Sequence, residues 1–164
     1  MPIKQTTAQS QVDAYIDRRM QMLIEALVYR LSVVGEEVIN HARSLPSPSA
    51  ASFPQGVRPH QPNYIDWTAN LRSSVGYVIA VDGHIVRESD FRTVKSGKDG
   101  SQKGKSYAES LVKNYPKGIV LIVVAGMNYA TYVSAKGYDV IDSAELMAQK
   151  LVPQIIGKLG LKKK

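Results

Sequence analysis

The run of seven consecutive apolar residues Ile119–Ala125 constrains the fold of this chain more than any other feature. Most of its side chains are β-branched, and Gly126 follows it directly. A run of this length without polar alternation predicts a strand covered on both faces. We therefore place this strand at the centre of the core. Downstream, Asn128 is a candidate cap for a short helix over 129–136, which Gly137 would end.

Length and composition predict a single domain over residues 1–164. Hydrophobic residues make up 44% of the chain, enough to bury one sizeable core. The absence of cysteine excludes a disulfide framework and a thiolate zinc site. No apolar run approaches the roughly 18–20 residues of a membrane-spanning helix, and residues 1–10 lack the apolar segment of a signal peptide. We expect no membrane partner and assembly in the cytoplasm.

A long amphipathic helix is predicted over residues 10–43. Its apolar side chains recur at intervals of three and four residues: Val12, Ile16, Met20, Leu23, Leu27, Leu31, Val34 and Val38. At about 1.5 Å per residue the helix reaches on the order of 50 Å, more than the expected width of the domain. Two interpretations stay open. Either part of the helix packs on something outside the domain, or the helix bends near Ser32–Gly35, where glycine lowers helix propensity.

Residues 44–63 are predicted to form a loop. They contain five prolines and four serines, which fix backbone angles and remove hydrogen-bond donors. Loops of this length in compact domains are usually functional or ordered by a partner. His60 lies in this loop, and a single histidine among prolines is more often incidental than a ligand.

A short helix is predicted over 66–75, with Asp66 or Thr68 as its cap. It contains Trp67, the only tryptophan of the chain. An indole ring in this position either covers the edge of the core or anchors an interface, and both interpretations stay open.

An antiparallel hairpin and a polar insertion follow. Residues 76–81 and 84–86 are apolar and are joined by Asp82-Gly83, a strong hairpin signal. Residues 87–106 contain three glycines and show no apolar period able to bury them, so we expect a flexible insertion. A short helix over 107–114 then precedes the apolar strand.

A C-terminal helix over 142–160 completes the predicted fold. Asp142 and Glu145 have the spacing of a capping box. Inward-facing apolar residues follow at helical intervals: Leu146, Ala148, Leu151, Ile155 and Leu159. The predicted class is α+β, with a long N-terminal helix, an antiparallel sheet of about four strands within 64–141, and this C-terminal helix.

The net charge of +7 is unevenly distributed. Two groups of lysines stand out, one in the polar insertion and one at the C-terminus: Lys95, Lys98, Lys103 and Lys105, then Lys162, Lys163 and Lys164. Clustered lysines bind phosphate through counterion release, and they also form solvated tails or contacts to acidic partners. Neither group has the interleaved aromatic residues typical of single-strand binders. Contact with DNA and contact with an acidic partner both stay open.

The sequence favours a non-enzymatic protein without cofactor or metal. His41, His60 and His84 fall on a helix end, a proline-rich loop and a hairpin turn, and none has an acidic neighbour at ligand spacing. The Gly-x-Ser-x-Gly pattern of a serine nucleophile is absent. The pair Glu36-Glu37 is typical of a solvated helix face.

Several short motifs carry a resemblance. They are the segment Thr68-Ala69-Asn70-Leu71-Arg72-Ser73-Ser74-Val75, the strand Ile119–Ala125, and Asn128-Tyr129-Ala130-Thr131-Tyr132-Val133 with Lys136-Gly137. Together they resemble the tail-completion or head-tail joining (neck, connector) family of tailed double-stranded DNA bacteriophages. In that family a threonine-capped Asn-Leu-Arg-Ser helix and a Tyr-Ala-x-Tyr-Val-x-x-x-Gly segment bracket the sheet. The likeness covers most of residues 10–160. Many members carry Glu-Phe-Gly-Thr where this chain has Ala135-Lys136-Gly137-Tyr138.

The resemblance implies a structural virion protein of the neck or tail. Copies would form an oligomeric ring that joins the portal or an adaptor to the tail and lines the DNA passage, with passive contact to packaged DNA. A closed ring needs a heterologous interface. Candidate interface residues are His60, Tyr64, Trp67, Tyr129, Tyr132 and Tyr138. The alternative function is a DNA-binding accessory module that uses the basic loop 95–105 and the C-terminal lysines.

Overall fold

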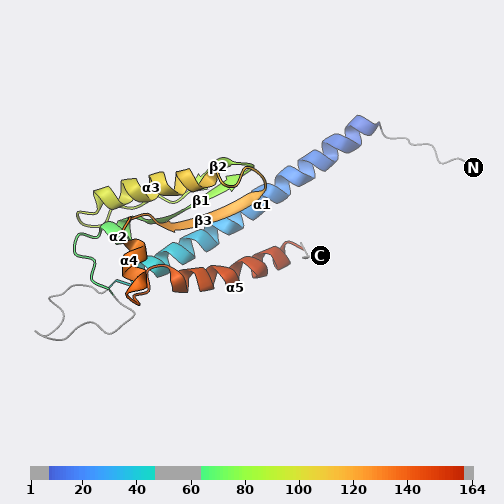
Figure 1. Cartoon of the computed structure of the whole chain (residues 1–164). Coiled ribbons are helices and arrows are strands. Elements are labelled where there is room, and N and C mark those ends of the chain that lie inside the picture. The colour runs from blue at the N-terminus through green and yellow to red at the C-terminus, as the bar shows by residue number, and fades with distance from the viewer. Residues whose placement is uncertain (1–7, 47–63, 161–164) are drawn as a thin grey trace, which may run out of the picture.

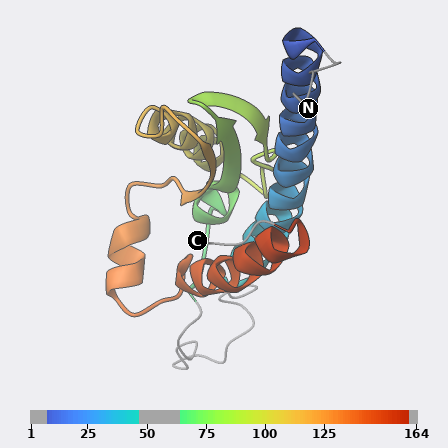
Figure 2. The ribbon, with the colours of Figure 1, turned by 90° about the vertical axis from the view of Figure 1, so that its right-hand side faces the viewer.

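Helices cover both faces of a small sheet in the computed structural model, which describes residues 8–46 and 64–160 (Figure 1). The elements are α1 (Gln9–Ser44), α2 (Asn70–Ser73), β1 (Val75–Val81), β2 (His84–Glu88), α3 (Lys98–Val112), β3 (Ile119–Ala125), α4 (Ala130–Ala135) and α5 (Asp142–Lys158). α3 lies on one face of the sheet, and α1 and α5 lie on the other (Figure 2). The class is α+β, with the predicted long N-terminal helix and C-terminal helix.

The sheet has three strands in the order β2-β1-β3, and both pairs are antiparallel. The expectation of about four strands is therefore too high for the described residues. The central strand is β1, whose first six residues are buried, whereas β3 forms an edge. An apolar run indicates that both faces of a strand are covered, but it does not indicate how many strands pair with it. The prediction that Ile119–Ala125 is the central strand is therefore wrong.

Side chains of the sheet alternate between two apolar clusters. β1 directs Val75, Tyr77 and Ile79 toward α1 and α5, and Val78 and Ala80 toward α3. Alternate residues of β3 join the same two clusters, which confirms that this strand is covered on both faces. Each fully buried valine or isoleucine stabilises the fold by roughly 1.5–3 kcal/mol relative to an exposed one.

The predicted hairpin is confirmed. Asp82 and Gly83 both have positive φ angles, 49° and 78°, as the two central residues of a tight hairpin turn require. The Asp82 carboxylate also accepts a hydrogen bond from the Gly118 amide at 2.8 Å. This bond joins the hairpin turn to the entry of β3.

The N-terminal helix does not bend at its glycine. α1 is one helix of 36 residues, and Gly35 lies directly over the ring of Tyr77 in β1. A Cβ atom at Gly35 would lie 2.8 Å from Cδ1 of Tyr77, closer than such atoms approach. Glycine at this position therefore allows the helix to pack closely on the sheet. The interpretation in which the helix bends near Ser32–Gly35 into two shorter helices is wrong.

The expectation that 87–106 lacks regular structure is wrong for its second half, because α3 begins at Lys98. The helix buries Gly100, Gly104, Ala108 and Val112. A Cβ atom at Gly100 would lie 1.9 Å from the carbonyl oxygen of Asn70, and one at Gly104 2.4 Å from that of Ser74. The first half of the inward face of α3 is thus made of glycine, which allows backbone-to-backbone contact and leaves no apolar period before Ala108.

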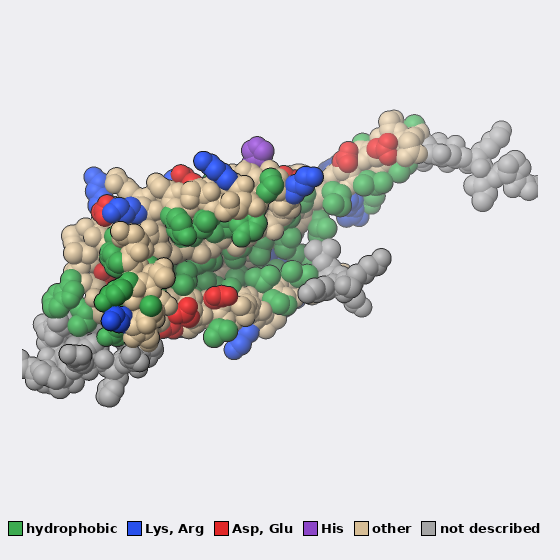
Figure 3. Space-filling model, viewed as in Figure 1, with side chains coloured by type: hydrophobic (Ala, Val, Ile, Leu, Met, Phe, Trp, Pro, Cys, Tyr) green, Lys and Arg blue, Asp and Glu red, His purple; other side chains and the backbone are tan. Residues whose placement is uncertain are grey.

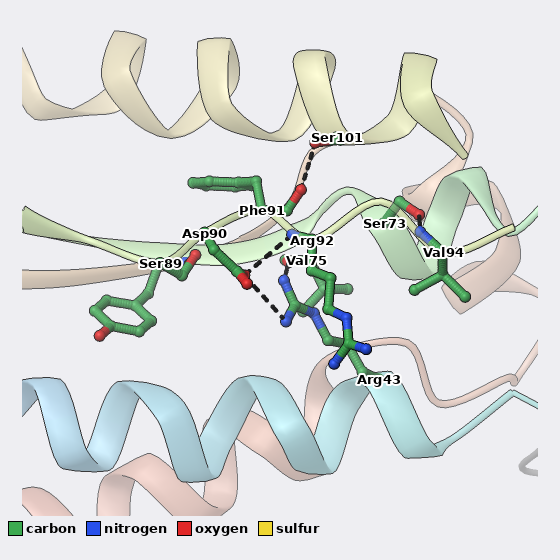
Figure 4. A network of polar contacts seen from close by, with 10 residues as sticks. Arg43, Ser73, Val75, Ser89, Asp90, Phe91, Arg92, Val94 and Ser101 are labelled. Atoms are coloured by element: carbon green, nitrogen blue, oxygen red, sulfur yellow. Dashed lines mark hydrogen bonds and ion pairs between the residues drawn. The ribbon is translucent and has the colours of Figure 1, made fainter. Parts of the chain in front are cut away.

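Hydrogen bonds hold the irregular segment between β2 and α3 in place (Figure 4). The amide of Val94 donates to Oγ of Ser73 at 2.9 Å, and Oγ of Ser101 donates to the carbonyl of Phe91. From the opposite face, Arg43 of α1 donates to the carbonyl of Val75 at 2.8 Å. Its guanidinium also lies 3.8 Å from the carboxylate of Asp90. These polar contacts order a segment that has few apolar side chains of its own.

The start of α5 differs in detail from the predicted capping box. The residue before the helix is Ile141, and Asp142 is already in the first turn. The carboxylate that accepts a hydrogen bond from a first-turn amide is Asp139, at 3.2 Å from the nitrogen of Ser143. Asp142 instead accepts from Oγ of Ser134 at 3.1 Å, which connects α5 to the end of α4.

The contact made by the glycines of α3 predicts that Gly104→Ala destabilises the protein. Alanine is the better helix former by about 1 kcal/mol, but overpacking against backbone that cannot move aside costs more, so we expect a net loss of about 2 kcal/mol. Urea denaturation followed by circular dichroism measures the change. Gly157→Ala in α5 is the matched control, because nothing lies within 4 Å of the added Cβ. It should raise stability, and equal effects of the two substitutions would contradict the contact.

Candidate functional site

A groove rich in aromatic side chains lies at the end of the molecule that carries α2 and α4. Its volume is about 560 Å³, and it is lined by Tyr64, Ile65, Asp66, Trp67, Thr68, Leu71, Tyr129, Tyr132, Val133, Lys136 and Tyr138. We call this cavity the aromatic groove. Figure 3 shows hydrophobic side chains gathered over this end of the molecule. The structure therefore brings together five of the six predicted interface residues, and the sixth, His60, lies outside the described residues.

Two segments far apart in the sequence form the walls of the groove. One wall is residues 64–71, which lead into α2, and the other is α4 with its flanks. The carboxylate of Asp66 accepts a hydrogen bond from the Arg72 amide at 2.8 Å, which fixes the first wall to α2. Gly137, with φ of 83°, ends α4 and turns the chain toward Tyr138, as predicted.

The aromatic rings differ in exposure. Trp67 is 74% exposed and Tyr132 is 64% exposed, whereas Tyr64 is only 5% exposed. The interpretation in which Trp67 covers the core edge is therefore wrong, and its indole ring is available to a partner. Large apolar side chains exposed beside a cavity are typical of interaction sites.

The polar groups of the groove include an unpaired donor and two opposite charges. The Tyr64 hydroxyl is buried and has no hydrogen-bond partner among the described residues. Burial, followed by the charge of Asp66, raises the pKa of this phenol well above its usual value. Burial and then the charge of Asp66 also raise the pKa of Tyr129. At the other end of α4, Nζ of Lys136 lies 5.1 Å from the ring centre of Tyr132. The groove thus has Lys136 at one end, and at the other it has Asp66 together with Arg72, whose positive charge partly offsets the effect of Asp66 on Tyr64.

The N-terminal part of α1 is a second surface that lacks cover. Residues 9–22 are exposed except for half-buried Val12, and they extend beyond the sheet for about 21 Å at 1.5 Å per residue (Figure 1). Tyr15, Ile16, Met20 and Met22 are each more than half exposed. Leu31 and the later apolar residues of α1 are buried against the sheet. The same apolar stripe continues toward the N-terminus of α1, past the end of the domain.

The lysines of the predicted basic loop lie beside or within α3, and two of them are paired with acidic groups. Lys103 lies 2.9 Å from the carboxylate of Asp99, and Lys105 lies 2.6 Å from that of Glu88. Lys95 precedes α3, and Lys98 is its first residue. The basic C-terminal residues Lys162, Lys163 and Lys164 lie outside the described residues. Part of the predicted basic patch is thus neutralised by neighbouring carboxylates.

Two of the three histidines lie within the described residues, and the ring of each is in hydrogen-bonding contact with one oxygen atom. Nε2 of His41 lies 2.8 Å from Oγ of Ser143, and Nδ1 of His84 lies 3.0 Å from the carbonyl of Asp82. The first contact joins α1 to α5. Residues 8–46 and 64–160 contain no group of three or more His, Cys, Asp or Glu side chains that could hold a metal ion. Within the same ranges no helix is long and apolar enough to cross a membrane.

Comparison with protein-family models, with curated proteins and with solved structures finds no significant match to this chain. The resemblance to phage neck proteins stays a prediction. The features of the described residues that bear on function are the aromatic groove, the uncovered part of α1 and the distribution of charge.

Sequence reasoning missed two residues of the groove, Asp66 and Lys136, as charged groups of a site. Asp66 was considered only as the cap of a helix over 66–75, whereas α2 begins at Asn70 and its N-cap residue is Ala69; Asp66 accepts from the Arg72 amide without being the N-cap. Lys136 was considered only as part of a motif. The available signal was that Asp66 adjoins Trp67 and that Lys136 is two residues from Tyr138.

The unpaired hydroxyl predicts that Tyr64→Phe stabilises the protein by about 1 kcal/mol at pH 7, because an unsatisfied buried donor is removed. Urea denaturation measures the change. Tyr132→Phe is the control, since its exposed hydroxyl should alter stability by less than about 0.5 kcal/mol. A loss of stability in Tyr64→Phe would show that the hydroxyl has a partner.

The raised pKa of the Tyr64 phenol predicts a dependence of stability on alkaline pH. The unfolded chain loses this proton near pH 10, before the folded chain does, so the free energy of unfolding falls as pH rises above about 10. Tyr77, whose pKa is raised to about 12 by burial and then by a hydrogen bond to Glu36, contributes in the same direction. Urea denaturation at pH 9 and pH 11 should show a smaller fall in the free energy of unfolding for Tyr64→Phe than for the wild type. Equal falls would contradict the raised pKa of Tyr64.

Proposed function

We propose that this chain is a non-enzymatic subunit of a ring in the head-tail connector of a tailed bacteriophage. Copies join the portal or an adaptor to the tail and line the passage for DNA. The observation that carries the proposal is the uncovered apolar part of α1, because an apolar helix face that extends past its own domain indicates a protein partner. The short motifs of the sequence supply the identity of the assembly.

The arrangement of surfaces favours a ring over a twofold dimer. The uncovered part of α1 and the aromatic groove lie at opposite ends of the molecule (Figure 1). A ring needs a heterologous interface, in which two different surfaces of each subunit meet, whereas a twofold dimer uses one surface twice. Both edges of the sheet, β2 and β3, also lack a neighbouring strand among the described residues. Such edges are available for contacts between subunits.

The distribution of charge favours a DNA-binding accessory module as the second candidate. Five basic residues lie outside the described residues and no acidic residue accompanies them, so the described residues carry only +2 of the net +7. The basic residues are Lys4, Arg58, Lys162, Lys163 and Lys164. Affinity for duplex DNA that falls steeply with salt would favour this candidate, and weak nonspecific retention would favour the ring.

Electron microscopy tests the proposed function directly. The purified chain should form rings, alone or on a portal or adaptor template. A tagged copy should be located at the neck or tail of purified virions. Absence of the chain from the particles would overturn the proposal.

The uncovered stripe of α1 predicts that the double substitution Ile16→Glu/Met20→Glu disrupts assembly. Both side chains are more than half exposed, so folding stability should change by less than about 0.5 kcal/mol, while two buried charges should weaken association at least a hundredfold. Sedimentation velocity and electron microscopy measure assembly. The control Arg18→Glu makes the same change in net charge on the opposite face of the helix. Unchanged assembly by the double variant would exclude this stripe from the interface.

A further inference from the structure

We propose that the aromatic groove binds the proline-rich segment of a second copy of this chain, through Pro59-His60-Gln61-Pro62 and the preceding Arg58. The inference rests on the proposed function, because it names the contact between neighbouring subunits of the ring. The recognition step itself is a property of the purified chain and is measured separately.

The shape and lining of the groove fit an extended proline-rich ligand. Such segments adopt the polyproline II helix and dock in grooves lined by aromatic side chains, since the helix is formed before binding. The spacing Pro-x-x-Pro is one helical turn and places both rings on one edge of the ligand, about 9 Å apart. A cavity of about 560 Å³ is of the size that holds small ligands, and Trp67 and Tyr132 present their exposed faces beside it.

The polar groups of the groove also fit. A polyproline II helix makes no internal hydrogen bonds, so its carbonyl groups need donors. The Tyr64 hydroxyl has no partner among the described residues, but it is buried in the wall and is not accessible to a ligand in this structure. The donor that the groove offers is the indole N–H of Trp67, a residue that is 74% exposed.

Charge sets the direction of the ligand. Arg58 is the only charged residue in 44–63, and it directly precedes Pro59. In the groove, Asp66 lies near the Tyr64 and Tyr129 phenols, while Lys136 lies over Tyr132. Arg58 therefore lies at the Asp66 end, and the chain runs from there toward Lys136.

Chain connectivity indicates a second copy as the source. Only Asn63 separates Pro62 from Tyr64, which is itself part of the groove wall. For its own Pro-x-x-Pro to lie in the groove, the chain would have to turn back within the residues next to Asn63, and two of these, Tyr64 and Ile65, are themselves part of the wall. The segment of a neighbouring copy has no such constraint. One groove and one segment in each copy give a heterologous contact that repeats around a ring.

The test is the binding of a fluorescein-labelled peptide of residues 55–63 to the full chain carrying Pro59→Ala/Pro62→Ala, which removes competition from the resident segment. Saturable anisotropy is expected, with a shift in the emission of Trp67, the only tryptophan. Trp67→Ala in the same background should weaken binding at least tenfold. Tyr115→Ala, 47% exposed between α3 and β3, should not weaken it. A peptide with both prolines replaced by alanine should show no saturation.

A double-mutant cycle tests the charge contact. Asp66→Asn keeps an oxygen that can accept from the Arg72 amide and removes the charge. We expect about threefold weaker binding from this substitution and a similar loss from Arg58→Ala in the peptide. The two losses should not add, because each removes the same contact. Full additivity would overturn the assigned direction.

Three results overturn the inference. The first is no saturable binding of the peptide. The second concerns the emission of Trp67 in the wild-type chain without peptide. If this emission equals that of the peptide-bound variant and does not change on dilution, the groove is occupied by the proline-rich segment of the same chain. The third is normal ring assembly by Trp67→Ala, which would leave the proposed ring in place without this contact. Absence of the chain from virions would overturn the proposed function alone.

Discussion

The backbone of α3 lies in direct contact with the backbone of α2 and of the residues after β3. This contact determines how closely α3 packs on the rest of the molecule. A Cβ atom at Gly126 would lie 2.4 Å from Cα of Gly104, and one at Gly104 would lie 2.4 Å from the carbonyl oxygen of Ser74, so both positions require glycine. The approach also lets the Gly100 amide donate to the Asn70 side chain at 3.1 Å, which holds α2 in place. Because α2 carries one wall of the aromatic groove, the geometry of the groove depends on glycines in another layer.

Elements whose signal is local could be predicted from the sequence. The hairpin at Asp82-Gly83, the long N-terminal helix and the end of α4 at Gly137 each depend on a few neighbouring residues, and each is present. Only the end of α3, within the helix predicted over 107–114, could be predicted, and its first part could not. The buried residues of that first part are Gly100 and Gly104, and each glycine lowers helix propensity by about 1 kcal/mol relative to alanine. Such a pattern is the same as that of a linker until the packing partner is known.

Most aromatic residues of the candidate site could be predicted from the sequence, but their proximity in the fold could not. Its aromatic side chains come from 64–68 and from 129–138, separated by sixty residues. They meet because β1 pairs with β3 with Val75 opposite Ala125, which puts the residues before β1 beside those after β3. No local pattern contains that register. Asp66 and Lys136 come to line one groove only through the same pairing, so no spacing in the sequence joins them.

The features on which the proposed assembly depends are those that contribute least to the stability of the isolated chain. An exposed indole ring, a buried hydroxyl without a partner among the described residues and an apolar helix face in water are each unfavourable there. They occur at the two ends of the molecule, whereas the sheet between them is packed on both faces. Cover on these two ends would remove their cost without any change in the packed sheet between them.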